Sequence, residues 1–116
     1  MNQYLLPPKR LEQVVSEEVI ALFRERVHIR ISDIIRLEAE RNYTRIIMAD
    51  GRPIITSRNL SFYEPLLPEE FVRVHKSHLI NRCYILQNCK TYISMSDGVE
   101  VEVARRKRKT TKYAIS

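Results

Sequence analysis

Glycine is so scarce in this chain that its two positions constrain the fold more than any other feature. The 116 residues contain only Gly51 and Gly98, and each follows an aspartate. Each Asp-Gly pair also lies between runs typical of β-strands, which is a strong signal for a β-hairpin, because glycine accepts the backbone conformation of a tight turn. We therefore expect one hairpin at Asp50-Gly51 and another at Asp97-Gly98.

The apolar pattern selects the register of the second hairpin. A three-residue loop, residues 96–98, pairs Met95 with Val99 and Ile93 with Val101, whereas a two-residue loop would place glutamates opposite Met95 and Ile93. A shift of one residue would turn the apolar set toward water, so we expect the three-residue loop, with its glycine in the left-handed position of a bulged turn. The first hairpin is apolar on both faces, and the sequence leaves its register open.

Strand patterns outnumber helical patterns, which predicts a mainly β fold. Residues 19–23 form a strand-like apolar run, and residues 27–31 alternate so that Val27, Ile29 and Ile31 are expected on a buried face. Residues 33–40 lead into residues 42–49, which are rich in β-branched and aromatic side chains.

One short helix is expected near residues 57–67, and a second from Arg105 to the end. Leu60, Tyr63 and Leu67 share one helical face, and Ser61 and Glu64 have the spacing of a capping box. Pro65 fits only near the start of a helix, and Pro68, directly after the segment, is expected to end it.

The positive charge of the chain is concentrated at its C-terminus. The net charge is +6, and residues 1–103 are neutral, so the whole excess lies in the segment "RRKRKTTK" at residues 105–112. A solvated terminal tail is the simple interpretation. The functional interpretation is a segment that binds phosphate groups, and nucleic acid is the partner that this charge favours.

Residues 75–81, "HKSHLIN", raise the question of a metal or catalytic site. After the apolar run "FVRV", an extended backbone would point His75 and His78 to opposite faces, and no third ligand is evident. Ser77 lacks a base held by a third group, and no glycine-rich phosphate loop exists. The sequence therefore predicts no enzyme, no metal and no cofactor.

Cys83 and Cys89 fit a reducing compartment as buried or idle thiols.

Polar readout of a nucleic acid remains the best explanation for three groups of donors. One contains Asn42 and Tyr43, one runs from His75 to Arg82, and one contains Arg105 and Arg106. Arginine and lysine match guanine in the major groove, asparagine matches adenine, and hydroxyl groups suit phosphate. RNA is a weaker alternative, because several aromatic residues that could stack on bases fit core positions better.

Three stretches of the sequence resemble the LytTR DNA-binding domain of bacterial transcription regulators. They are "DIIRLEAERNYTRIIMADGR", "FVRVHKSHLIN" and "SDGVEVEVARR", and the resemblance runs from about Val19 to Lys109. The "F-x-R-V-H-x-S" core, Phe71 to Ser77, is its most specific part. The resemblance implies an elongated fold of layered antiparallel β-sheets with one or two short helices, in which loops at strand ends enter the major groove.

The resemblance also implies which side chains meet double-stranded DNA. Carried over to this sequence, the candidate contacts are Asn42, Tyr43, His75, Lys76, Ser77, Arg105, Arg106 and Arg108. Lys76 stands where arginine is common, and lysine lacks the planar fork that binds guanine through two hydrogen bonds. Ala104 replaces the commoner serine and removes one hydroxyl donor. Asn81 is assigned to structure, as the side chain that ties down the "HLIN" turn, while Leu79 and Ile80 anchor it to the core.

The same resemblance sets the expected context of the domain. Residues 1–16 are interpreted as a linker or N-terminal arm, and residues 17–116 as the DNA-binding domain with a basic tail. The opening "YLLPPK" is similar to the end of a receiver domain, so the chain is either a part of a two-component response regulator or a stand-alone protein.

No signal-peptide pattern opens the chain, and a cytoplasmic location is expected. One domain reads a short site, so two copies on a repeated element are expected. The competing function is an interaction module that pairs with a full-length regulator and inhibits it.

Overall fold

The computed structural model describes residues 18–24 and 26–115, so the expected N-terminal arm, residues 1–16, lies outside the described residues. The described chain falls into two compact units that meet at Asp33 and Ile34. In the first unit, β1 (Val19–Leu22) pairs antiparallel with β2 (Val27–Arg30), and η2 (Ile31–Asp33) follows. Ile29 and Ile31 are buried as expected, but Val27 is 37% exposed. The alternation therefore fails at Val27, the residue that begins β2 directly after the turn.

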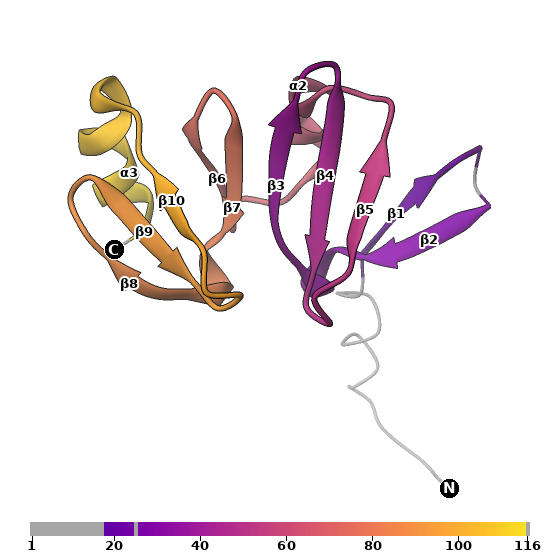
Figure 1. Ribbon diagram of the computed structural model, residues 1–116, viewed down its shortest axis with the longest axis horizontal. Coiled ribbons are helices and arrows are strands. Elements are labelled where there is room, and N and C mark those ends of the chain that lie inside the picture. Colours follow the sequence, from indigo (N-terminus) through magenta and orange to yellow (C-terminus); the bar gives the residue numbers. More distant parts are fainter. Residues whose placement is uncertain (1–17, 25, 116) are drawn as a thin grey trace, which may run out of the picture. The chain divides into compact units, whose positions relative to one another are not determined.

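A five-stranded antiparallel sheet forms the first part of the second unit (Figure 1). Its strand order is β5-β4-β3-β7-β6, and β3 lies in the middle with four consecutive buried residues at its start. The strands are β3 (Ile34–Glu40), β4 (Tyr43–Met48), β5 (Pro53–Thr56), β6 (Phe71–His75) and β7 (His78–Asn81). The buried run at its start includes Arg36 and does not alternate, because a central strand is covered on both sides and the pairing with β4 shifts between Ile34 and Arg36.

A three-stranded antiparallel sheet forms the second part of this unit. Its order is β10-β9-β8, with β8 (Ile85–Asn88), β9 (Tyr92–Met95) and β10 (Glu100–Glu102), and η4 (Arg82–Tyr84) precedes it. The expected register is confirmed, because Ile93 pairs with Val101 and the Met95 amide donates to the Val99 carbonyl over 2.9 Å. Gly98 has φ +86°, in the left-handed region expected for it.

The first Asp-Gly hairpin uses the same turn, which the sequence had left open. The Met48 amide donates to the Arg52 carbonyl over 3.0 Å, so Ala49, Asp50 and Gly51 form a three-residue loop. Gly51 has φ +90°, a conformation that glycine adopts at little cost.

One apolar core connects the two sheets of the second unit. It gathers inward-facing side chains of β3, β4, β6, β7, β9 and β10 together with Val103. Leu79 and Ile80 are almost completely buried, as expected for the anchors of the "HLIN" turn. A polar link accompanies this core: the Arg36 guanidinium on β3 donates to the Asp97 carboxylate, 3.0 Å away, in the β9–β10 turn.

The first helix has a different cap from the one that the sequence predicts. The segment α2 (Leu60–Tyr63) begins after Asn59, whose side-chain oxygen accepts a 3.0 Å hydrogen bond from the Phe62 amide. The predicted capping box of Ser61 and Glu64 is wrong, because Ser61 already lies inside the helix. The burial of Leu60 and Tyr63 is confirmed. Pro65 falls in η3 (Glu64–Leu66), so the α-helix ends after one turn.

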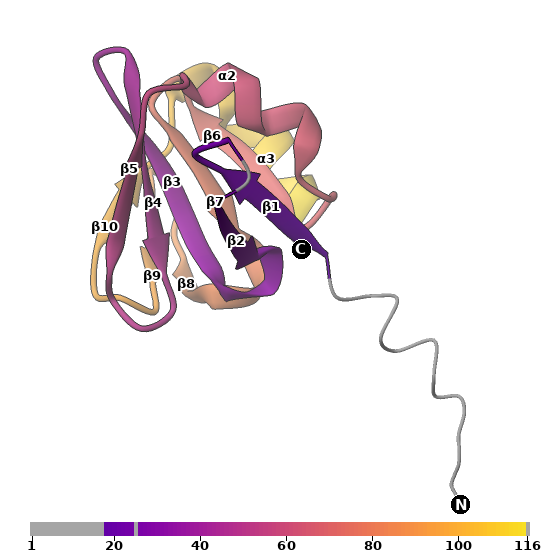
Figure 2. The same cartoon turned by 90° about the vertical axis from the view of Figure 1, so that its right-hand side faces the viewer.

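The basic C-terminal segment is helical, which confirms the helix expected from Arg105 onward. It forms η5 (Arg105–Lys107) and α3 (Arg108–Ile115), and Ile115 packs against the core. The interpretation as a free tail is therefore wrong for residues 105–115. Seen from the side, α3 lies behind the sheet that contains β6 and β7 (Figure 2). Among the described residues, no helix is long and apolar enough to cross a membrane.

Candidate nucleic-acid interface

The first candidate segment is the turn between β3 and β4. Glu40 pairs with Tyr43, so Arg41 and Asn42 alone make the connection. Arg41 has φ +60°, a left-handed conformation that is uncommon for a residue other than glycine. Asn42 is exposed, and half of the Tyr43 surface is exposed. Both predicted contact residues are therefore available to a partner.

The second candidate segment is the turn between β6 and β7. His75 pairs with His78 across the hairpin, which leaves Lys76 and Ser77 as the turn. The expectation that the two histidines point to opposite faces is wrong, because the chain reverses between them. Their ring centroids lie 5.4 Å apart. Lys76 is exposed at the tip.

The His75 ring holds this turn from the inside. Its Nδ1 accepts a 3.1 Å hydrogen bond from the Ser77 amide. An Nδ1 that accepts must be unprotonated, so the neutral ring carries its proton on Nε2. That nitrogen lies 3.9 Å from a carboxylate oxygen of Glu102. His75 can therefore shape the turn with one nitrogen and offer a donor with the other.

Arg73 braces the same turn, a role that was not predicted from the sequence. Its Nε donates to the His75 carbonyl over 3.0 Å, and its Nη2 donates to the Lys76 carbonyl over 2.6 Å. Its Nη1 donates to Glu64 over 2.6 Å. An arginine in a strand two residues before the turn is the signal that could have indicated it. The guanidinium can satisfy both carbonyls at once because its donors form a rigid fork.

His78 is suited to stay neutral. Burial lowers its pKa below the ordinary value of 6.5, and the positive charge of the nearby Arg36 lowers it further. Its Nδ1 is buried and makes no hydrogen bond to the described residues. A neutral, half-buried ring beneath the turn is less available to a partner than the exposed Lys76 at the tip.

The third candidate segment follows β10. The Ala104 amide donates to the Val74 carbonyl of β6 over 2.9 Å, which fixes the start of η5 beside the end of β6. Arg105 and Arg106 are both exposed. Arg108 is only half-buried as a residue, but its Nε is buried and has no hydrogen-bond partner among the described residues.

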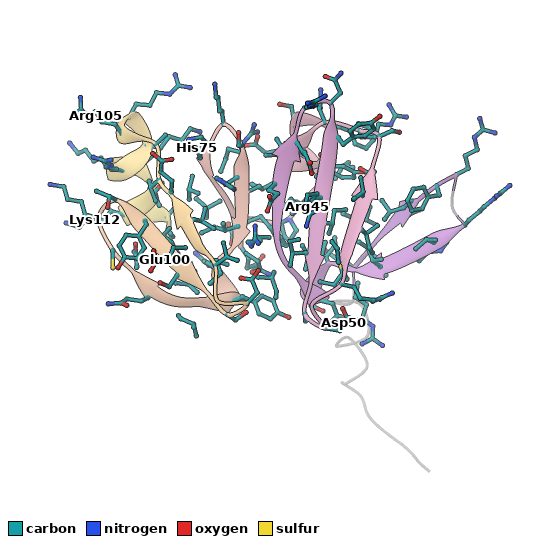
Figure 3. All side chains as sticks on the ribbon, viewed as in Figure 1. Arg45, Asp50, His75, Glu100, Arg105 and Lys112 are labelled. Atoms are coloured by element: carbon teal, nitrogen blue, oxygen red, sulfur yellow. The ribbon has the colours of Figure 1, made fainter. Side chains whose placement is uncertain are left out.

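The strand registers bring the three segments to one edge of the second unit. Strands β3 and β7 are antiparallel, Glu38 pairs with His78, and the Ala39 amide donates to the Ser77 carbonyl over 2.9 Å. The β3–β4 and β6–β7 turns therefore lie at the same end of the sheet. Figure 3 shows His75 and Arg105 toward this end and Asp50 at the opposite end. We call this end, with Asn42–Tyr43, His75–Ser77 and Arg105–Arg106, the contact edge.

A further basic side chain, Arg58, lies at this end and was not predicted. The loop between β5 and α2 is held there by Thr44, whose Oγ1 donates to the Arg58 carbonyl over 2.7 Å. Arg58 is exposed, and its guanidinium lies over the Phe62 ring, 4.5 Å from the centroid. The face of an aromatic ring attracts a cation, and Arg58 stays exposed to solvent in this position. Arg58 thus adds positive charge to the contact edge.

Asn81 has the structural role that was predicted for it. The side chain is 3% exposed, and its Nδ2 donates to the Ile34 carbonyl over 2.9 Å. Its Oδ1 accepts from the Cys83 amide over 3.0 Å and caps η4. Cys83 itself is exposed, so of the two expected states, buried or idle, the buried one does not apply to this residue. Both cysteines are free, and the described residues contain no group of three or more side chains suited to hold a metal ion.

Comparison with known proteins identifies the class of the protein as a DNA-binding domain. A family model described as the LytTr DNA-binding domain matches residues 24–116. The structure is also similar to a solved one described as the LytTr DNA-binding domain of a putative methyl-accepting/DNA response regulator from Bacillus cereus. That match has a TM-score of 0.70 and 22% sequence identity, and it covers 87% of this chain and 99% of that chain. No curated protein matches the sequence. The chain belongs to the LytTR family, and the mainly β, antiparallel fold expected for it is confirmed.

Proposed function

We propose that the contact edge binds double-stranded DNA in a sequence-specific manner, with its three segments in the major groove. The observation that carries this proposal is the strand register, which brings Asn42–Tyr43, His75–Ser77 and Arg105–Arg106 to one end of the same compact unit. Separate loops on one rigid sheet can meet separate base pairs, since strand-end turns project beyond the sheet. No α-helix needs to enter the groove, because the third segment is the single 3-10 turn η5.

Each segment contributes a different chemistry to this interface. Arg105 is the candidate for paired hydrogen bonds to guanine, and Asn42 matches adenine. Lys76 brings a point charge to the tip of its turn, and the Nε2 of His75 brings a single donor. Arg106 and Arg108 suit phosphate oxygens, which fix position on the duplex and carry no sequence information.

The proposal is tested by separating specificity from affinity. Arg105→Ala, Lys76→Ala and Tyr43→Ala are compared with Arg106→Ala, each titrated against a duplex selected from a random library and against an unselected duplex. A side chain that reads bases should cost about 1–3 kcal/mol on the selected duplex and much less on the unselected one. Arg106→Ala should weaken both, and its log–log salt slope should be shallower by about 0.9, because one phosphate is no longer neutralised.

Equal losses on both duplexes for Arg105→Ala and Lys76→Ala would show that these residues hold only phosphate. Truncation after Arg106 is not a suitable test, because it removes Ile115 from the core. Circular dichroism of each variant serves as the control for folding. The expected spectrum is dominated by strands.

The stoichiometry and the partner are tested in the same titrations. A single domain covers a short site, so two copies on a repeated element are proposed, and the selected duplex should show two bound chains at saturation. A structured RNA at matched salt should compete poorly. If the chain bound neither nucleic acid but paired with a full-length LytTR regulator, the interaction module would be the correct function.

We further propose that the domain serves a cytoplasmic transcriptional regulator of the two-component type, in which a receiver domain belongs to the parent chain. The family assignment supports this context, since the similar solved structure is described as part of a response regulator. Whether the parent chain contains a phosphoryl-accepting domain is answered by sequencing the transcript that encodes it.

A further inference from the structure

A cavity of about 740 Å³ lies between the β8–β9 turn and the C-terminal helical segment. One wall comes from Asn88, Cys89 and Lys90, and the other comes from η5, α3 and Val103. The volume falls within the range of small-molecule sites, about 300–1,000 Å³. Figure 1 shows α3 beside the end of the sheet where β8 and β9 connect. Of the residues that line this cavity, the DNA proposal uses Arg105 for base readout and Arg108 for phosphate.

The charge of the cavity wall has one sign. Its described lining contains no carboxylate, and its charged residues are Lys90, Arg105, Arg108, Lys109 and Lys112. Cations from two separate parts of the chain that face one concave space raise the local concentration of anions. The remaining lining includes Val103, which is fully buried, and Cys89, which can both contact the apolar part of a ligand.

Arg108 is the lining residue best suited to bind a phosphate group. It lines the cavity and is half-buried as a residue. Arginine binds phosphate with short, charge-assisted hydrogen bonds, often two at once. A phosphate group in the cavity can therefore be held by Arg108 together with the lysines of the same lining.

We propose that this cavity binds a small phosphorylated organic molecule. The phosphate group lies among the cations near Arg108, and the organic part lies against Val103 and Cys89. Cations from two separate parts of the chain line one concave space, which can surround a small ligand more completely than it can meet a phosphate on the outside of a duplex. The regulatory consequence rests on the proposed function: a ligand that holds Arg105 competes with DNA for it.

Adenosine monophosphate serves as the probe, because it joins a phosphate to an apolar ring system. The full chain is titrated by calorimetry without DNA, with sodium sulfate at equal ionic strength as the control anion. We expect saturable binding of the nucleotide and none of sulfate. Backbone amide resonances of residues 88–90 and 108–112 should shift, and those of Lys76 and Ser77 should not.

Two lysine variants separate the cavity from the contact edge. Lys90→Ala changes an exposed turn residue of the cavity, and it should weaken nucleotide binding about tenfold, the loss of one charge-assisted hydrogen bond, with DNA binding unchanged. Lys76→Ala changes an exposed turn residue outside the cavity, and it should leave nucleotide binding unchanged while it weakens DNA binding. Saturating nucleotide should release bound DNA from the wild-type chain.

Several outcomes would overturn the proposal. One is the absence of saturable nucleotide binding, and another is equal binding of sulfate. If Lys90→Ala weakens DNA binding as much as nucleotide binding, the cavity is part of the DNA surface. If the nucleotide binds but releases no DNA, the competition is refuted. A chain that binds no DNA at all would refute the proposed function, and the titration without DNA would still decide the cavity.

Discussion

Asp97 and Asp50 occupy the same position in two similar hairpin turns, and we expect different effects when each is replaced by asparagine. The carboxylate of Asp97 lies 3.0 Å from the Arg36 guanidinium, and the two side chains are only 14% and 6% exposed. Asp50 lies 2.7 Å from Arg52, with both side chains more than half exposed. Asparagine keeps the shape and the turn acceptor of aspartate and removes the charge.

The magnitude follows from what remains around Arg36. Removal of one partner from a buried ion pair typically costs about 3–5 kcal/mol, because the other charge stays buried. Glu38 still accepts a 2.6 Å hydrogen bond from Arg36 and offsets part of this loss. We therefore expect Asp97→Asn to lower the free energy of unfolding by about 2–3 kcal/mol. For a domain of this size the melting temperature should fall by about 10–20 °C.

Urea unfolding and thermal melts of the two variants test this directly. Asp50→Asn should melt with the wild type, because exposed ion pairs contribute little. In the double variant Arg36→Met/Asp97→Asn the buried cation is gone, so a large part of the loss should be recovered. Equal and small effects of Asp97→Asn and Asp50→Asn would refute the claim that burial makes the Arg36–Asp97 pair important.

Three further predictions concern the contact edge. Arg73→Lys should weaken binding to the selected duplex about tenfold, because lysine cannot donate to both turn carbonyls at once. Glu64→Gln should have little effect, and equal effects of the two substitutions would rule out a role for the Arg73 hydrogen bonds in DNA binding. Glu102→Gln should strengthen binding to selected and unselected duplexes alike, most at low salt, since it removes a negative charge near His75; an unchanged affinity would place this carboxylate away from phosphate. Because the folded-state pKa of His78 lies below 6.5, the unfolded chain takes up the proton first, and stability should fall as the pH drops below about 6.5. Urea unfolding at pH 7.5 and 5.5 should show a smaller loss for His78→Gln than for the wild type, and identical losses would contradict the assigned direction.

The parts of the fold that the sequence predicts are those governed by local patterns. The register of the second hairpin follows from apolar alternation on both sides of an Asp-Gly pair, and the structure has that register. The hairpin of β6 and β7 carries no such signal. Its turn, Lys76-Ser77, contains no glycine, and its conformation is maintained by Arg73 and His75, which act through hydrogen bonds that no spacing rule indicates.

Long-range partners explain the remaining differences. Arg36 and Asp97 are 61 positions apart, so no local rule could pair them. The cap of α2 was assigned to Ser61 because its spacing to Glu64 is typical of a capping box, but Asn59 takes the position. The candidate residues of the contact edge were predicted from groups of polar donors and from family resemblance. Arg58 was missed because no local pattern indicates that β5 ends at that edge, where Thr56 pairs with Thr44 and the Thr44 hydroxyl bonds to the Arg58 carbonyl.

The three segments of the contact edge are joined to one another by main-chain atoms. The Ala39 amide bonds to the Ser77 carbonyl, and the Ala104 amide bonds to the Val74 carbonyl. A substitution at Tyr43, Lys76 or Arg105 changes none of these atoms. Under the proposed DNA-binding function, a substitution at one segment can therefore change the base preferred there while the spacing between the three positions along the duplex stays the same.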